Sequence, residues 1–374
     1  MQIITKRKIG LIVNPLAGIG GKVGLKGSDG RDTVQKAFSL GAEIISPQRA
    51  IETLKSLISE KDRFELVTYP SEMGETEAIT AGFEPVVLGS ILSGETTAVD
   101  TRRAACEMKE YGVCLIIFVG GDGTARDIYE AIGVDIPVIG IPAGVKIHSS
   151  VYAVNSRRAG ELIKAFLDDK APSQEKEVMD IDEDLFRQGR VSARLYGYLK
   201  VPFERRLLQG AKSPSQDSGE NIRRLAEYVV ERMKKEEAYY ILGPGSTMKA
   251  IGEVLGIEKT LLGVDMVHWR QQIGKDMNER QLLEQIQGRK VKIIVTVIGG
   301  QGYIFGRGNQ QISARIIMSV GKQNIMIVAT KNKLLSLDGP LLVDTGDLGC
   351  DQYLSGFIRV ITSVNEETVW KVDA

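Results

Sequence analysis

The sequence is poor in the residues that build metal sites and disulfide frameworks. Its 374 residues include only two histidines, His148 and His268, which excludes a histidine-rich metal site. The three cysteines, Cys106, Cys114 and Cys350, show no paired metal-ligand spacing, and an odd number argues against a disulfide framework. We therefore expect them to be small buried apolar residues.

An excess of one charge and a long apolar run are also missing. Lysine plus arginine equals aspartate plus glutamate, 48 of each, so bulk electrostatics favour neither nucleic acid nor membrane as a partner. No apolar run approaches the length of a membrane span, and the first residues, MQIITKRK, lack the apolar core of a signal peptide. We expect a cytoplasmic enzyme that binds small molecules, with any phosphate site formed locally.

Residues 114–127, CLIIFVGGDGTARD, carry the strongest chemical signal. Their six leading apolar residues predict a strand that is buried on both faces of a parallel sheet. Gly120, Gly121, Asp122 and Gly123 break that strand. Thr124 is then expected to begin and cap a helix that ends at Gly133, with Asp127 completing a Thr-x-x-Asp capping pattern.

A strand, a glycine turn and a helix N-terminus together form an anion site, because free backbone amides and the positive helix end attract phosphate. A carboxylate beside a phosphate repels it unless Mg²⁺ or a hydroxyl proton lies between them. Asp122 is therefore interpreted as a metal partner or a general base. The alternative is a structural corner in which Asp122 accepts hydrogen bonds from loop amides.

The motif Gly120-Gly121-Asp122-Gly123-Thr124 resembles the signature of NAD kinases, diacylglycerol and sphingosine kinases, and 6-phosphofructokinases. Three further stretches, Asn14-Pro15, 140–146 and 306–310, resemble the ATP-NAD kinase-like branch that includes acetoin-catabolism-associated proteins. The resemblance spans nearly the whole chain. The nucleotide and phosphate-binding residues that we expect are Asn14, Gly18, Gly120, Gly121, Gly123, Thr124, Asp127, Gly144 and Lys146.

Two of the expected loops depart from known patterns. The glycine-rich loop from Gly18 is not a Walker A loop, because Lys22 is followed by Val23 and not by Ser or Thr. Residues 144–148 lack the Asn-Asp pair usual in related lipid kinases, and no Asn-Glu pair of common NAD kinases is evident. Lys146 is suited to a phosphate as a point charge, or is a solvated lysine.

Residues 1–170 are expected to form an α/β nucleotide-binding domain. Strands alternate with helices, which predicts a doubly wound parallel sheet whose ligands gather at the carboxyl ends of the strands. The loops 14–24, 69–74, 89–97, 120–124 and 142–149 lie at such ends and can form one cleft. The polar run 168–177 is expected to be a linker.

Residues 171–374 are expected to form a second α/β, substrate-binding domain whose last segment can return to the first. A hairpin at 178–201 and a mobile segment at 211–219 precede strands that lead into glycine-rich loops at 243–247 and 299–309. These loops resemble the phosphate loops of sugar-phosphate isomerases of the ribose-5-phosphate isomerase type. The expected second-substrate residues are Gly243, Gly245, Ser246, Thr247, Arg307 and Asn309. Asp344 and Asp347 are candidates for Mg²⁺ or ribose hydroxyls, or are turn acids at the surface.

The resemblance implies a kinase that uses ATP and Mg²⁺ to phosphorylate the 2′-hydroxyl of NAD, giving NADP. Asp122 would then orient or deprotonate that hydroxyl. Two alternatives stay open: a kinase of a lipid or an acetoin-related alcohol, and a non-catalytic sensor of nucleotides or sugar phosphates. The sequence also leaves open ATP or polyphosphate as donor, the ligands of any metal, and whether the chain forms a homo-oligomer.

Overall fold

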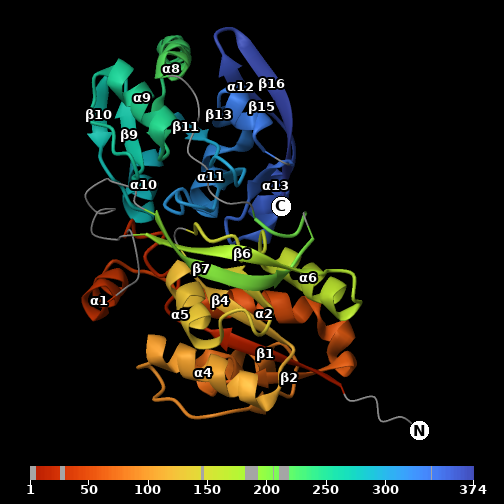
Figure 1. The fold of residues 1–374 in the computed structure, drawn as a ribbon. Coiled ribbons are helices and arrows are strands. Elements are labelled where there is room, and N and C mark those ends of the chain that lie inside the picture. Colours follow the sequence, from red (N-terminus) through yellow and green to blue (C-terminus); the bar gives the residue numbers. More distant parts are fainter. Residues whose placement is uncertain are drawn as a thin grey trace. The chain divides into compact units, whose positions relative to one another are not determined.

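The computed structural model describes residues 6–25, 30–144, 147–181, 193–204, 206–209, 219–337 and 339–374. The chain forms two compact units (Figure 1). Unit 1 comprises residues 1–19, 27–38 and 43–211, and unit 2 comprises residues 20–26, 39–42 and 212–374. The domain boundary expected at residue 170 thus falls inside unit 1, and the end of the chain belongs to unit 2.

Unit 1 is built on a five-stranded sheet with the order β3-β2-β1-β4-β5, in which every neighbouring pair is parallel. Its strands are β1 (Arg7–Val13), β2 (Phe64–Thr68), β3 (Val86–Val87), β4 (Leu115–Gly120) and β5 (Val138–Pro142). The expected doubly wound parallel sheet is confirmed. The strand order reverses between β1 and β4, and ligands of such sheets bind outside the carboxyl ends at this point.

The helices of unit 1 follow local signals in the sequence. They are α1 (Arg31–Ser39), α2 (Ser46–Ser56), η1 (Ile58–Arg63), η2 (Ser71–Met73), α3 (Glu75–Thr80), α4 (Ala98–Tyr111), α5 (Asp122–Ile132) and α6 (Ser156–Leu167). In α4 a capping box of Thr97 and Asp100 satisfies the first turn, and Gly112 ends the helix in the left-handed conformation.

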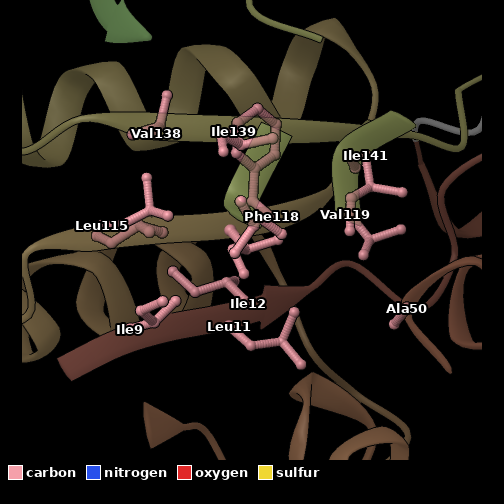
Figure 2. Close-up of a cluster of buried hydrophobic side chains, with 14 of the residues drawn as sticks. Ile9, Leu11, Ile12, Ala50, Leu115, Phe118, Val119, Val138, Ile139 and Ile141 are labelled. Atoms are coloured by element: carbon pink, nitrogen blue, oxygen red, sulfur yellow. The ribbon is translucent and has the colours of Figure 1, made fainter. Parts of the chain in front are cut away.

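Strand β4 lies at the centre of the unit 1 core. All six of its residues are buried, as a strand covered on both faces requires. Figure 2 shows Leu115, Phe118 and Val119 packed among apolar side chains of β1 and β5. Burying a side chain of this size contributes about 1.5–3 kcal/mol, so this packing fixes where the strand ends and the glycine motif begins.

An antiparallel hairpin of β6 (Ser173–Ile181) and β7 (Ala193–Pro202) completes unit 1. The linker expected at 168–177 is wrong, because β6 begins within it. The side chains at 173–177 are polar, so the sequence gives no apolar pattern that would predict a strand there. The hairpin is nevertheless anchored in the core by Val178, Leu199 and Val201, which are fully buried. The mobile segment expected at 211–219 lies, except for Gly219, outside the described residues.

Unit 2 has a mixed nine-stranded sheet with the order β10-β9-β8-β11-β13-β15-β16-β14-β12. Strands β8, β11 and β13 are mutually parallel, and β15 and β16 form an antiparallel hairpin. The strands are β8 (Tyr239–Leu242), β9 (Asp265–His268), β10 (Gln271–Gly274), β11 (Val291–Thr296), β12 (Tyr303–Phe305), β13 (Ile325–Val328), β14 (Leu341–Val343), β15 (Gly356–Ser363) and β16 (Glu366–Asp373).

Helices accompany this sheet, so the expected second α/β domain is confirmed. They are α8 (Gly219–Lys234), α9 (Ser246–Leu255), α10 (Glu279–Ile286), α11 (Ala314–Val320), η3 (Lys322–Asn324), α12 (Lys331–Leu335) and α13 (Leu348–Leu354). Among the described residues of both units, no helix combines the length and the apolar character that crossing a membrane requires.

Candidate functional site

The carboxyl ends of β1, β4 and β5 bring three loops together in unit 1. Asn14 follows β1 and donates through Nδ2 to Oγ1 of Thr124, at 3.0 Å. Gly18 has a positive φ of 81°, and a Cβ there would lie 1.9 Å from the carbonyl oxygen of Ala143. Only glycine fits this approach, because the obstacle is backbone.

The loops after β4 and β5 also lie close to each other. A Cβ on Gly144 would lie 2.8 Å from Cα of Gly121, and the amide of Gly144 donates to the carbonyl of Gly120 at 3.1 Å. The structure therefore gathers several predicted residues at one edge of the sheet. Those residues are Asn14, Gly18, Gly120, Gly121, Gly123, Thr124 and Gly144. Lys146 lies outside the described residues.

Helix α5 begins at Asp122, two residues before the predicted start, with Gly121 as its N-cap. Thr124 therefore does not cap the helix, and its buried hydroxyl accepts the hydrogen bond from Asn14 instead. Because the amides of the first helical turn have no acceptor within the helix, this end of α5 presents donors to an anion. The prediction of a helix N-terminus at the glycine motif is confirmed, but its capping residue is different.

Asp127 is also placed differently from the capping prediction. It lies beyond the first turn of α5, and its Oδ1 is 2.7 Å from Nη1 of Arg102 on α4. Burial raises the pKa of Asp127 to about 6, while Arg126 and Arg102 act in the opposite direction. The Asp127 carboxylate thus links α5 to α4. Among the described contacts, none joins it to the glycine turn.

The carboxylate of Asp122 is buried, with 5% of the residue exposed. Its Oδ2 accepts the amide proton of His148 at 2.7 Å, and its Oδ1 accepts that of Ser149 at 3.0 Å. The structural alternative, in which Asp122 accepts hydrogen bonds from loop amides, is therefore observed, although the loop is the one after β5. Each carboxylate oxygen has a second lone pair, so the bonds do not exclude a further partner.

His148 is a neighbour of Asp122 that the sequence analysis did not propose as a site residue. It is 6% exposed, and its Nδ1 lies 3.4 Å from Oδ2 of Asp122. Among the described residues, neither of its ring nitrogens has a hydrogen-bond partner. The sequence could have indicated His148 as a site residue, because it lies in a loop that follows a parallel strand. Such loops meet at one edge of the sheet.

The donors around Asp122 do not form a resident metal site. Within the described parts of the chain, no group of three or more His, Cys, Asp or Glu side chains is arranged to hold an ion. Mg²⁺ commonly retains several waters and binds substrate phosphates through one or two carboxylates. An ion held in this way would need phosphate oxygens from a ligand in addition to Asp122.

A second group of predicted residues surrounds the start of α9 in unit 2. Gly245 is the N-cap, with a φ of 113°, and Ser246 begins the helix. The buried Thr247 accepts from Oγ1 of Thr296, at 3.4 Å, at the end of β11. Lys333 donates through Nζ to the same Thr296 oxygen at 3.2 Å. Lys333 was not among the residues expected from the sequence, and it adds a positive charge to this strand end.

The polar groups of Arg307 and Asn309 contact other residues of unit 2. Nη2 of Arg307 lies 3.0 Å from Oδ2 of Asp344, and the two side chains are 5% and 3% exposed. Asn309 donates to the carbonyl of Ile304 and accepts from the amide of Gly306. Arg307 was expected to be a donor to a ligand, but its guanidinium is paired with the acid that we had considered for Mg²⁺.

Asp347, the other acid considered for Mg²⁺, caps a helix. Its Oδ1 accepts the amide proton of Cys350 at 2.8 Å at the start of α13. This is the ordinary role of an aspartate at an N-cap. Both acids of the loop after β14 thus have polar partners within unit 2.

Two family models match the chain. Residues 9–171 match the ATP-NAD kinase N-terminal domain, and residues 235–372 match the ATP-NAD kinase C-terminal domain. The second match identifies residues 235–372 with a kinase domain, whereas the short loops in that region had resembled those of sugar-phosphate isomerases. A comparison with curated proteins gives no significant match.

Solved structures give only distant matches. Two are described as a putative diacylglycerol kinase from Bacillus anthracis str. Sterne, with 17% and 18% identity and TM-scores of 0.27 and 0.24. They cover 48% and 49% of this chain, which in turn covers 47% and 46% of theirs. A third, described as a diacylglycerol kinase from the same organism, is 16% identical with a TM-score of 0.21, covering 50% of this chain and 60% of its own. These scores are too low to support an argument about fold or function.

Proposed function

Because the chain belongs to the ATP-NAD kinase family, we propose that it transfers the γ-phosphoryl group of ATP to the 2′-hydroxyl of NAD, giving NADP. Family membership supports the ATP-dependent kinase activity. The choice of NAD as acceptor is the finer part of the proposal, and it is the part that the assay below tests.

The observation that carries the proposal is the glycine turn from Gly120 to Thr124 at the start of α5. A Cβ on Gly120 would lie 2.4 Å from Oγ1 of Thr124, so the turn folds directly onto the first turn of the helix. Amides of a helix start and a turn without side chains together suit phosphate oxygens. We assign the phosphates of ATP to this turn, with Asn14, Gly18 and Gly144 holding the neighbouring loops around it.

Catalysis of phosphoryl transfer depends chiefly on positioning and on charge stabilisation. We assign Asp122 to the acceptor hydroxyl, which it orients or deprotonates. Its two backbone bonds, from His148 and Ser149, fix the carboxylate at the start of α5. A carboxylate held in this way loses little freedom when the hydroxyl binds, which is the advantage of a preorganised site.

One observation favours another small alcohol as acceptor. Residues 144–148 lack the Asn-Asp pair of related lipid kinases, and no Asn-Glu pair of common NAD kinases is evident in the sequence. The second candidate function is therefore phosphorylation of a different hydroxyl compound, such as a lipid or an acetoin-related metabolite, by the same chemistry. A protein that binds nucleotides without turnover is the third outcome that an assay can reveal.

Purified protein incubated with Mg·ATP and NAD is expected to form NADP, measured with a coupled NADP-specific dehydrogenase. NADP offered as acceptor should not be phosphorylated, because a site that binds the free 2′-hydroxyl closely rejects a substrate that lacks it. Consumption of ATP with another alcohol but not with NAD would move the conclusion to the second candidate. Binding of NAD and ATP in a thermal-shift assay with no turnover would indicate a sensor.

We also propose that residues 243–247 bind phosphate of the second substrate, with Lys333 as counter-charge. Lys333→Met is expected to raise the KM for the acceptor about tenfold or more, because a hydrogen bond to a charged group contributes about 1.5–3 kcal/mol. The KM for ATP should change little. The matched control is Lys331→Met on the same helix, because Lys331 is 57% exposed and pairs with Glu366. Equal changes in both KM values would remove this role from Lys333.

A further inference from the structure

His148 is a buried titratable side chain that the fold itself does not explain. Buried polar groups nearly always have a hydrogen-bond partner, and one without a partner costs about 1–3 kcal/mol. Within the part of the chain that the structure describes, both ring nitrogens of His148 lack one, whereas the ring of the other histidine, His268, stacks on Tyr239 at 4.2 Å between centroids. A cost of this kind inside a predicted substrate site calls for a functional reason.

The loop that carries His148 is held firmly beside Asp122. Ser149 donates its hydroxyl to the carbonyl of Met179, and its own carbonyl accepts from Nε2 of Gln209 at 2.9 Å. The backbone amides of His148 and Ser149 donate to the Asp122 carboxylate. The imidazole is thus held by its backbone at the start of α5, with Nδ1 3.4 Å from Oδ2 of Asp122.

We propose that His148, and not Asp122 itself, takes the proton of the acceptor hydroxyl. In this arrangement Nδ1–H points to Asp122 and leaves Nε2 as the proton acceptor, because a hydrogen bond at one ring nitrogen fixes the function of the other. Oδ2 of Asp122 accepts the His148 amide proton with one lone pair and has a second lone pair for this bond. Asp122 becomes the positioning residue of an acid–histidine pair.

The step balances in protons and electrons. The O–H bond of the acceptor breaks, its proton passes to Nε2, and its electron pair forms the new bond from oxygen to the γ-phosphorus. The bond from that phosphorus to the bridging oxygen of ATP breaks, and ADP leaves with the electron pair. The positive imidazolium is stabilised by the negative Asp122 until it returns its proton to water. The inference rests on the proposed kinase function and specifies which atom accepts the proton.

His148→Gln tests the role in the intact protein. Turnover is expected to fall by about 10²–10⁴-fold, the usual range for general acid–base groups, while both KM values stay near those of the wild type. His268→Gln is the matched control and should leave turnover unchanged. Turnover near the wild-type value in His148→Gln would overturn the proposal.

Rescue experiments separate chemistry from packing. In His148→Gly, added imidazole should restore turnover far better than pyrazole, which has the same size but is a much weaker base. If imidazole is no better than pyrazole, His148 does not accept the proton and the proposal fails. Thermal melting of both variants shows whether they are folded at the assay temperature.

A measurement without turnover distinguishes this inference from the proposed function. In ¹⁵N-labelled protein, long-range ¹H–¹⁵N spectra should show the ring proton of His148 on Nδ1, and His268→Gln assigns the two imidazoles. A proton on Nε2 would overturn the proposed pair even if NADP is formed. The expected tautomer together with no phosphorylation of NAD would instead reject the acceptor and leave the pair in place.

Discussion

Replacing Asp122 by asparagine is expected to lower turnover with Mg·ATP and NAD by about 10²–10⁴-fold. Asparagine keeps the size of the side chain but removes the negative charge that orients the hydroxyl, directly or through His148. The phosphate-binding turn from Gly120 to Thr124 uses backbone amides and remains. Binding of ATP, measured by calorimetry or thermal shift, should therefore persist while steady-state turnover is lost.

The same substitution is also expected to lower stability, since the Asp122 carboxylate accepts two backbone protons. The NH₂ group of asparagine would face the amide of either His148 or Ser149, which leaves a buried donor unsatisfied at a cost of about 1–3 kcal/mol. Asp135→Asn is the matched control, because Asp135 is 58% exposed and pairs with Lys109. Near-native turnover with a lowered melting temperature would reduce Asp122 to the residue that holds the β5 loop.

Arg307→Ala is expected to lower the free energy of unfolding by about 3–5 kcal/mol, the usual cost of removing one partner of a buried ion pair. The Asp344 carboxylate, 3% exposed, would lose its partner at 3.0 Å. The guanidinium also lies 5.0 Å from the centre of the Tyr303 ring, and that contact would be lost too. The loop is tight here, because a Cβ on Gly306 would lie 1.8 Å from the Asp344 carbonyl.

Tryptophan fluorescence during urea unfolding measures this effect. The two tryptophans of the chain, Trp269 and Trp370, both belong to unit 2, so the signal reports the unit that contains Arg307. Arg359→Ala is the control, because Arg359 is 80% exposed and lies 3.8 Å from Glu367, and surface pairs of this kind contribute about 0–1 kcal/mol. An unchanged midpoint together with a raised acceptor KM would favour the ligand-binding role predicted from the sequence over a structural role.

Local patterns in the sequence were sufficient for many elements of the fold. Strand β4 was correctly predicted to be buried on both faces, and helix α5 ends at Gly133 as expected. A buried parallel strand needs a continuous apolar run, and a helix end needs a cap or a glycine, so both signals lie within a few residues. Strand β6 begins with polar residues and has no continuous apolar run, so its first residues were predicted to be a linker.

Some features of the candidate site were likewise predictable from the sequence, and others were not. The glycine turn and the helix start that follows it were determined by the sequence itself, because a strand end, a glycine turn and a helix start are neighbours in the chain. The partners of the site side chains were decided only by the tertiary structure. Asp122 meets the His148 amide 26 residues later, Arg307 meets Asp344 37 residues later, and Lys333 meets Thr296 37 residues earlier. The sheet sets these pairings when it brings the carboxyl ends of separate strands together, and hydrophobic periodicity along the chain contains no information about which polar side chains then meet.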